Sequence, residues 1–500
     1  MSLFQKINDH DVKIEEMIRG WGIVSVFLVL ILTHCGSFEN EKPNVIVLIA
    51  DDVSWNDFGC YGNDEVKTPN IDRLSRRGLR FNNAFLTTSS CSPSRISIMT
   101  GRYPHNTGAA ELHTEPGENF MTLAQALKDG GYYTGQAGKW HMGELIKAGF
   151  DTIHLGQTLN GEGGEQQWVS CLKTRDKKKP FFFWFDSYDA HRPWGENQFS
   201  GTHNPNQITP PVYHYNGIRT RQDLANYYDE IARFDFFVGQ VLLELEQQGV
   251  LENTYIVIMA DNGRPFPRDK TRLYESGIKT PLILAGPENK MKGGSSCSRL
   301  VSSIDLAPTI LEWAGLQAPE SMQGNSFNVL LKNPTHLFRK YVYAEHNWHD
   351  FEAFERMVRS EDYLYIFNAR TDFPNQGPAD VLHGTSFREL KQNLDSGKLS
   401  DFQKDIFLVP RSSEELFWCK GDTLQLNNLV EVLSFRESLD VLRQALQVWI
   451  RETDDNIPDT LTGDWYDRAF GDALPIQRQR GEMPGKTSGA EFNHTKPGFY

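Results

Sequence analysis

One stretch of this chain, residues 89–102, combines the side chains best suited to chemistry. Cys91 is followed by Pro93 and Arg95, and a Thr-Gly-Arg triplet closes the stretch. A lone cysteine is more often a small buried hydrophobe than a reactive group. Here its neighbours form a set with fixed offsets, so we take Cys91 as the candidate nucleophile and expect the rest of the chain to be arranged around it.

Oxygen-bearing side chains follow two of the most apolar runs in the sequence, residues 44–50 and 255–260. Such continuous runs are typical of strands buried on both faces of a parallel sheet, and ligands bind beyond the carboxyl ends of these strands. An aspartate at a strand end is also a common turn or cap residue. Two such strand ends together favour a site for Ca²⁺, or Mg²⁺, over zinc, because all the donors are oxygens. The four side chains are Asp51, Asp52, Asp261 and Asn262.

Cationic groups lie between and after these strands. The segment 138–143 contains Lys139 and His141, and the aromatic run 181–185 leads to a loop with His191 and Arg192. A third group, which contains Arg268, Lys270 and Arg272, follows Asn262, and Arg268 is expected at the surface. A lone histidine is usually structural, but one in a loop beside Asp and Arg after a strand is a better candidate for acid–base work.

These motifs resemble the signature of type I sulfatases. The stretch around Cys91 reads C-x-P-S-R with a trailing T-G-R, and residues 138–143 resemble the family's G-K-x-H element. Residues 189–193 resemble D-P-H-x-P, with Ala190 in place of the usual proline. The run D-N-G-x-P-F-P after residue 260, followed by a basic residue and L-Y, is similar to the heparan sulfamidase branch. The resemblance covers most of residues 44–330 and recurs near 442–454.

The resemblance implies a mechanism. In the family, the cysteine at position 91 is oxidised to Cα-formylglycine, whose hydrate attacks sulfur, and that residue joins the four oxygen ligands around Ca²⁺. Lys139, Lys270 and the metal would bind the sulfate oxygens, with Arg272 as the runner-up to Lys270, while Arg95 would hold the hydrate. Asp261 would assist as a base. His191 would protonate the leaving atom, and His141 would accept the proton that releases the covalent sulfate. The alkaline phosphatases share this layout but usually bind zinc.

Composition limits the functional classes. The formal net charge of -14 argues against a nucleic-acid partner, which would need a basic face. The six cysteines are widely spaced and include no C-x-x-C pair, so neither a zinc site nor a dense disulfide framework is indicated. Four of them are left as thiols or as one or two bridges.

The N-terminal residues 1–36 read as a signal peptide. Residues 21–32 are almost wholly apolar but shorter than the roughly 20 residues that span a bilayer, and a charged segment precedes them. Cys35 directly follows, as in a bacterial lipobox, although His34 is unusual before the cysteine. We expect an exported lipoprotein, periplasmic or at the cell surface, with membrane attachment by the lipid anchor only. The alternative is a signal peptide cleaved nearby with no lipid.

The expected fold class is α/β, with an alkaline-phosphatase-like large mixed sheet flanked by helices and a smaller C-terminal antiparallel subdomain. We place the catalytic domain at residues 37–335 and the C-terminal α+β subdomain and tail at 336–500. Helical periodicity predicts helices at 224–248 and 434–452, and β-rich patterns predict strands at 341–345 and 363–366. Residues 463–500 are expected to wrap the surface or fray.

The leading function is hydrolysis of sulfate from a sulfated polysaccharide or oligosaccharide, either algal (such as ulvan) or a glycosaminoglycan. A narrower alternative is a sulfamidase acting on N-sulfoglucosamine, and an alternative of another class is a non-catalytic carbohydrate-binding lipoprotein. Arg192, His346 and His349 are the candidates for binding the sugar. For the two histidines, the alternative is that they belong to a surface loop without a binding role. A formylglycine-generating or anaerobic sulfatase-maturating enzyme is the implied partner.

Overall fold

The computed structural model describes residues 42–118 and 120–490, and residues 43–490 lie in one compact unit. The predicted signal segment and Cys35 lie outside the described residues. Among the described residues, no helix is both long enough and apolar enough to cross a bilayer.

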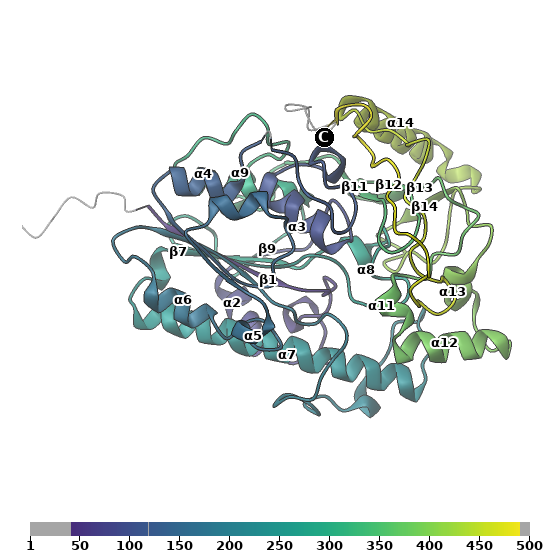
Figure 1. Cartoon of the computed structure of the whole chain (residues 1–500), viewed down its shortest axis with the longest axis horizontal. Coiled ribbons are helices and arrows are strands. Elements are labelled where there is room, and N and C mark those ends of the chain that lie inside the picture. The colour runs from purple at the N-terminus through teal and green to yellow at the C-terminus, as the bar shows by residue number, and fades with distance from the viewer. Residues whose placement is uncertain (1–41, 119, 491–500) are drawn as a thin grey trace, which may run out of the picture. The chain divides into compact units, whose positions relative to one another are not determined.

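A mixed eight-stranded sheet forms the centre of this unit (Figure 1). Five neighbouring strands run parallel, and the remaining edge begins with a strand antiparallel to them. In spatial order the strands are β5 (Thr152–Leu155), β4 (Tyr133–Gly138), β6 (Phe181–Asp186), β1 (Asn44–Ala50), β7 (Thr254–Ala260), β8 (Leu282–Ala285), β2 (Leu79–Phe81) and β9 (Ser295–Cys297). The predicted large mixed sheet is confirmed.

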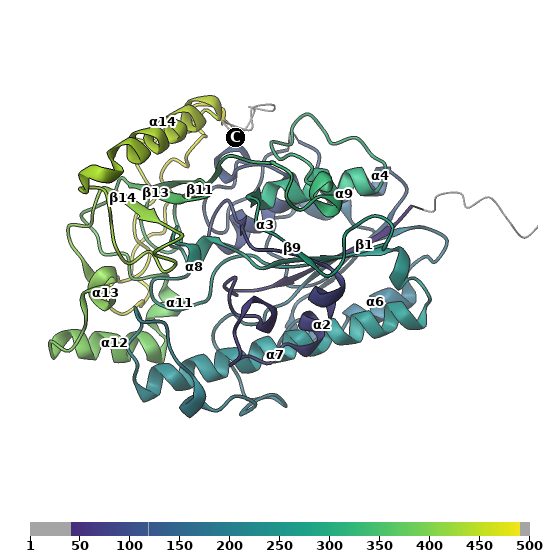
Figure 2. The same ribbon diagram turned by 180° about the vertical axis from the view of Figure 1, so that it is seen from behind.

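Helices cover both faces of the sheet, which explains why β1 is apolar at every position. Val45, Val47 and Ile49 face one core, while Ile46 and Leu48 face the other. Figures 1 and 2 show α3, α4 and α9 on one side, and α2, α6 and α7 on the other. These helices are α2 (Pro69–Arg77), α3 (Cys91–Thr100), α4 (Leu123–Asp129), α6 (Trp168–Thr174), α7 (Ile218–Gln247) and α9 (Leu306–Trp313).

A second, antiparallel sheet of four strands follows in the sequence. Its strands are β11 (Val342–His346), β12 (Glu355–Arg359), β13 (Tyr363–Asn368) and β14 (Glu414–Trp418), and β10 (Val301–Ser302) pairs separately with β3 (Ala84–Phe85). One face of the second sheet shares the core of the large sheet through Val342, Met357 and Ile366. The chain therefore forms the expected large mixed sheet first and the smaller antiparallel sheet after it. The domain boundary at residue 336 stays a prediction, because side chains from both sheets pack in one core.

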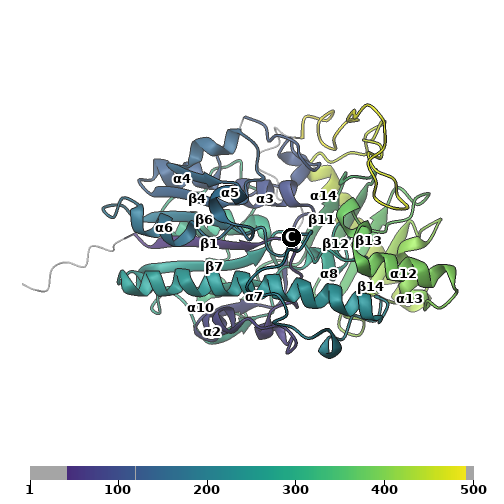
Figure 3. The same cartoon turned by 60° about the horizontal axis from the view of Figure 1, so that its bottom comes forward.

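The remaining helices are short, apart from α14, which packs over the small sheet (Figure 3). They are α5 (Gln157–Asn160), α8 (Glu275–Ile278), α10 (Asn328–Lys332), α11 (Ala379–Leu382), α12 (Thr385–Asp395), α13 (Asp401–Lys404) and α14 (Arg436–Glu452). The predicted helix at 224–248 begins earlier, at Ile218 in α7. Residues 462–480 of the tail bind back onto the protein: Thr462 and Arg480 both donate to Glu111, at 2.9 and 2.7 Å.

Candidate active site

Four adjacent parallel strands, in the order β4, β6, β1 and β7, end at one place in the sheet. Lys139 follows β4 and Asp186 is the last residue of β6. Asp51 with Asp52 follows β1, and Asp261 with Asn262 follows β7. Because parallel strands present their carboxyl ends to the same edge, side chains far apart in sequence meet here.

Cys91 faces these strand ends from the first turn of α3. Its Sγ lies 4.0 Å from Asp51 Oδ1 and 3.9 Å from Asp52 Oδ1, and the residue is 2% exposed. Burial raises the pKa of the Cys91 thiol, and the charges of Lys270 and Lys139 only partly offset this. The side chain is therefore a neutral thiol at pH 7, which is a poor nucleophile.

Arg95 lies one helical turn after Cys91 and links three of the strand ends. Its Nε and Nη2 donate to the two oxygens of Asp186 at 2.8 and 3.0 Å, and its Nη1 donates to Asp261. Asp51 Oδ1 is 3.5 Å from Nη2. All four side chains are fully buried, so the guanidinium fixes the positions of carboxylates that would otherwise repel one another.

Two lysine ammonium groups complete the charged cluster. Lys139 Nζ donates to Asp51, and Lys270 Nζ lies 2.7 Å from Asp52 Oδ2 and 2.9 Å from Asp380 Oδ2. Although burial alone would raise it, the charges of Lys139 and Arg95 lower the pKa of Asp51. These two lysines are the residues predicted to bind sulfate oxygens, and the structure brings them to the same centre as Cys91.

The oxygen donors fit a hard divalent cation. Asn262 Nδ2 donates to Asp52, while the buried Asn262 Oδ1 has no hydrogen-bond partner among the described residues. Asp51, Asp52 and Cys91 offer ligand atoms within 4.8 Å of one another. When all five carboxylates here (those of Asp51, Asp52, Asp186, Asp261 and Asp380) are ionised, the three cationic side chains leave two negative charges, which a divalent ion would balance.

The excess negative charge also affects Asp261. Burial raises the pKa of Asp261 to about 8. The negative charges of Asp51 and Asp52 also raise this pKa, and the positive charges of Arg95 and Lys139 only partly oppose the rise. A carboxylate that is costly to ionise among other carboxylates gains most from a bound cation.

Asp52, His191 and Asp380 form another group whose ligand atoms lie within 4.8 Å of one another. The ammonium group of Lys270 already contacts both of these carboxylates. We therefore assign this group to charge pairing rather than to a second metal.

The two predicted acid–base histidines lie at this centre. His191 Nε2 is 4.0 Å from Asp52 Oδ2 and 3.6 Å from Asp380 Oδ2, and its Nδ1 is bonded to the carbonyl of Arg192. His141 Nε2 shares a 2.8 Å hydrogen bond with His113 Nδ1. Burial, reinforced by Lys139 and Arg95, lowers the pKa of His141 well below its ordinary value, so its imidazole is neutral and can accept a proton.

Arg192 does not face the catalytic centre as a free cation. Its two terminal nitrogens donate to both oxygens of Asp223, at 3.0 and 2.7 Å, and its Nε donates to the carbonyl of Pro265 at 2.8 Å. Its guanidinium also stacks on Trp194. These contacts tie the His191 loop to α7 and give Arg192 a structural role, while its contact with the sugar stays a prediction.

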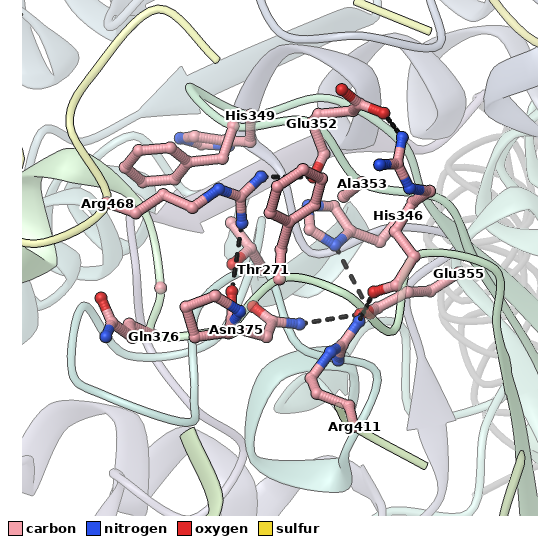
Figure 4. Close-up of a pocket in the computed structure, with 15 residues that line it drawn as sticks. Thr271, His346, His349, Glu352, Ala353, Glu355, Asn375, Gln376, Arg411 and Arg468 are labelled. Atoms are coloured by element: carbon pink, nitrogen blue, oxygen red, sulfur yellow. Dashed lines mark hydrogen bonds and ion pairs between the residues drawn. The ribbon is translucent and has the colours of Figure 1, made fainter. Parts of the chain in front are cut away.

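His346 and His349 line a pocket beside the catalytic centre (Figure 4). His349 Nδ1 bonds Ser90 Oγ at 2.8 Å, next to Cys91, whereas His346 Nδ1 faces Glu355 Oε2 at 3.5 Å. The free space in this pocket is about 20 Å³, enough for about one water and too little for a sugar. His349 is thus adjacent to the reaction centre, and the proposed sugar contact of His346 is not supported by its surroundings.

Three residues of the centre were missed by the sequence analysis: Asp186, His113 and Asp380. Asp186 could have been found, because it lies at the end of an apolar strand, as Asp51 does. His113 lies in a loop, with φ of 61°, and carries no motif. Asp380 is the second residue of α11, 110 residues after its partner Lys270. Arg268, expected at the surface, is instead buried and bonded to Asp405.

Comparison with known proteins agrees with this geometry. The family model described as Sulfatase matches residues 43–163 and 165–316, more than half of the chain. The chain belongs to the sulfatase family. A second model, described as N-sulphoglucosamine sulphohydrolase, C-terminal, matches residues 266–373.

Individual sulfatases match over most of the chain. An ulvan-active sulfatase from Formosa agariphila is 29% identical over 482 residues, covering 84% of this chain and 77% of its own. The N-sulphoglucosamine sulphohydrolase of Homo sapiens is 29% identical over 476 residues, covering 86% of this chain and 93% of its own. A protein solved in complex with D-glucosamine-2-N,6-O-disulfate shares the fold, with a TM-score of 0.66 and 22% identity over 82% of this chain and 98% of its own.

Proposed function

We propose that this sulfatase hydrolyses sulfate groups of a sulfated polysaccharide or oligosaccharide. The observation that carries the proposal is the convergence of Lys139 and Lys270 on the carboxylates that surround Cys91. The relatives named for ulvan and N-sulphoglucosamine support a carbohydrate as the substrate.

On this proposal Cys91 acts after conversion to formylglycine, which supplies a hydrated aldehyde to attack sulfur. The buried neutral thiol supports this, because an unconverted Cys91 is not activated as a thiolate. Arg95 holds the hydroxyl groups at position 91 and keeps Asp261 in place. Asp51, Asp52, Asp261 and Asn262 would hold Ca²⁺, which would polarise a sulfate oxygen.

The other side chains act on charge and protons. Lys139 and Lys270 each retain an ammonium hydrogen for a sulfate oxygen after their carboxylate contacts. His191 Nε2 faces the carboxylate of Asp380 and delivers a proton to the leaving atom. His141, held neutral, takes a proton from position 91 in the second half of the reaction.

Substitution of Cys91 tests the proposal. We expect Cys91→Ala and Cys91→Ser to abolish turnover of sulfated sugars and of an aryl sulfate while the melting temperature stays within a few degrees, because both replacements are small. Intact mass is the matched control, since the converted wild type should weigh about 18 Da less than the thiol form. A variant that kept more than a few per cent of the activity would remove the central claim.

The sulfamidase alternative keeps a specific observation in its favour, the C-terminal match to N-sulphoglucosamine sulphohydrolase. A desulfation panel of ulvan, carrageenan, heparin and N-sulfoglucosamine separates the two readings. The non-catalytic alternative is opposed by the assembled set of Arg95, Lys139, His141 and His191.

Export and anchoring complete the proposal. The apolar segment before Cys35 supports export, with lipidation of that residue as the membrane attachment. A formylglycine-generating or anaerobic sulfatase-maturating enzyme would convert Cys91. Metabolic labelling with a fatty-acid analogue, with Cys35→Ala as the control, tests the anchor.

A further inference from the structure

Asp380 reaches the catalytic centre from a segment to which neither the sequence motifs nor the family matches assign a role. It lies beyond the residues matched by the sulphoglucosamine model. Its Oδ1 accepts the backbone N–H of Val381 at 2.9 Å, which fixes the carboxylate, and its Oδ2 faces Lys270 and His191. The side chain is 22% exposed, so part of it remains open to an incoming molecule.

The distance from Asp380 to His191 places the carboxylate beside the scissile bond. On the proposed function, on which this inference rests, His191 Nε2 protonates the leaving atom, which must come within about 3 Å of that nitrogen. Asp380 Oδ2 is 3.6 Å from the same nitrogen. Because these two atoms are so close, an atom can lie about 3 Å from both of them. The leaving atom can therefore contact the acid His191 and the carboxylate of Asp380 at the same time.

An ionised carboxylate can only accept hydrogen bonds. The leaving oxygen of an O-sulfate carries no hydrogen, so its lone pairs and the carboxylate repel. The leaving nitrogen of an N-sulfate carries one hydrogen and can donate it to Asp380. A second sulfate or carboxylate on this side of the sugar would be repelled, because the like charges would meet in a largely desolvated site.

We propose that Asp380 is a specificity-determining residue that accepts the N–H of an N-sulfated amino sugar. A hydroxyl group on a neighbouring carbon of an O-sulfated sugar offers the same donor chemistry from another source. A site built to pair a donor disfavours the analogue that lacks it, because the lone pairs of the ester oxygen then face the carboxylate of Asp380.

Asp380→Asn tests the assignment, since it conserves shape while removing the charge. Using the full, converted protein, we would measure kcat/KM for glucosamine 2-N-sulfate, glucose 3-O-sulfate, whose leaving oxygen is flanked by hydroxyl groups, and 4-nitrophenyl sulfate, which has no such donor. We expect the N-sulfate to aryl sulfate ratio to fall at least about tenfold, and the 3-O-sulfate to aryl sulfate ratio to stay within about twofold. Asp472→Asn, an exposed acidic residue, is the matched control and should change neither ratio.

Each contrary result has a distinct meaning. Equal losses on all three substrates would overturn the proposal and make Asp380 a positioning residue for Lys270 and His191. A matching fall for the 3-O-sulfate would assign the contact to a hydroxyl and overturn the N–H assignment. A wild type that cleaves aryl sulfate but not the N-sulfate would overturn this inference alone, whereas no turnover of any sulfate would sink the proposed function itself.

A binding measurement on inactive protein gives an independent readout. In a Cys91→Ser background, we expect Asp380→Asn to weaken the affinity for glucosamine 2-N-sulfate about tenfold while the affinity for inorganic sulfate is not weakened. Equal weakening for both ligands would contradict the assignment. Circular dichroism and melting temperature confirm that the compared variants are folded.

Discussion

At the scale of single residues, hydrogen-bond partners separate the groups that are free to act from those that hold the structure. Lys139 and Lys270 keep an ammonium hydrogen beyond their carboxylate contacts. Arg192 instead uses three of its five N–H donors on Asp223 and the carbonyl of Pro265, and only 9% of its side chain is exposed. Three cations of similar prominence in the sequence therefore have two different tasks.

Arg192→Ala should act through structure rather than through sugar recognition. The pair with Asp223 is buried, with 9% and 5% of the two side chains exposed, so removal of Arg192 leaves an uncompensated carboxylate. We expect the free energy of unfolding to fall by about 3 kcal/mol, measured by urea denaturation. Because the substitution loosens the His191 loop, kcat/KM should fall by similar factors on an oligosaccharide and on an aryl sulfate.

Arg436→Ala is the control, since its pair with Asp440 is exposed and should contribute less than about 0.5 kcal/mol. A loss confined to the oligosaccharide would restore the sugar-reading role of Arg192.

At the scale of elements, continuous apolar runs made the central strands predictable. The runs at 44–50, 181–185 and 255–260 became β1, β6 and β7 to within a residue, because a strand buried on both faces must be apolar throughout. The polar residues after β1 and β7 followed from the same pattern, whereas Asp186 at the end of β6 was missed. Asp380 could not be predicted, because its short helix lies in a polar segment and only tertiary packing brings it to Lys270. The pairing of Arg192 with Asp223 was hidden for the same reason.

A buried ion pair joins the loop after α3 to β11. His105 Nδ1 lies 2.8 Å from Glu345 Oε1, and both side chains are fully buried. Burial alone would lower the pKa of His105, but the negative charges of Glu345 and Asp455 raise this pKa above 6.5. Burial likewise opposes the ionised form of Glu345, yet His105 lowers the pKa of Glu345 from 4.5 to about 2.

These shifts predict a pH window for stability. The contribution of His105 is fully present below pH 6.5 and is lost as the pH rises through its raised folded value. The contribution of Glu345 is present above pH 4.5 and is lost as the pH falls toward about 2. We expect His105→Asn to destabilise the protein more at pH 5.5 than at pH 8, measured by urea unfolding.

His336→Asn, at an exposed histidine, is the control and should show no such pH dependence. A loss of stability for His105→Asn that is equal at both pH values would refute the assigned protonation.

At the scale of the whole molecule, one centre depends on contributions from the large sheet, from α3 and from a segment between strands β13 and β14 of the small sheet. The oxygen-only ligands make this centre dependent on a hard cation. We expect chelation with EGTA or EDTA to reduce turnover at least about a hundredfold and to lower the melting temperature by several degrees, because the uncompensated carboxylates then repel. Ca²⁺ should restore both properties.

Asn262→Ala is the informative variant, since it removes the unpartnered oxygen and should raise the Ca²⁺ concentration needed for recovery. Activity that survived chelation, or that returned only with zinc, would place the chemistry with the zinc-dependent phosphatases instead.

The burial of Cys91 also has a consequence for when the protein can become active. Only 2% of this residue is exposed, and Leu112 and Trp348 pack around it. Trp348 belongs to a segment made more than 250 residues later, and its indole N–H is bonded to the carbonyl of Gly463 at 2.9 Å. On the proposed function, a maturation enzyme must therefore reach Cys91 while the chain is still emerging or unfolded. Folding and conversion compete in time, so a chain that folds first remains a stable protein without activity.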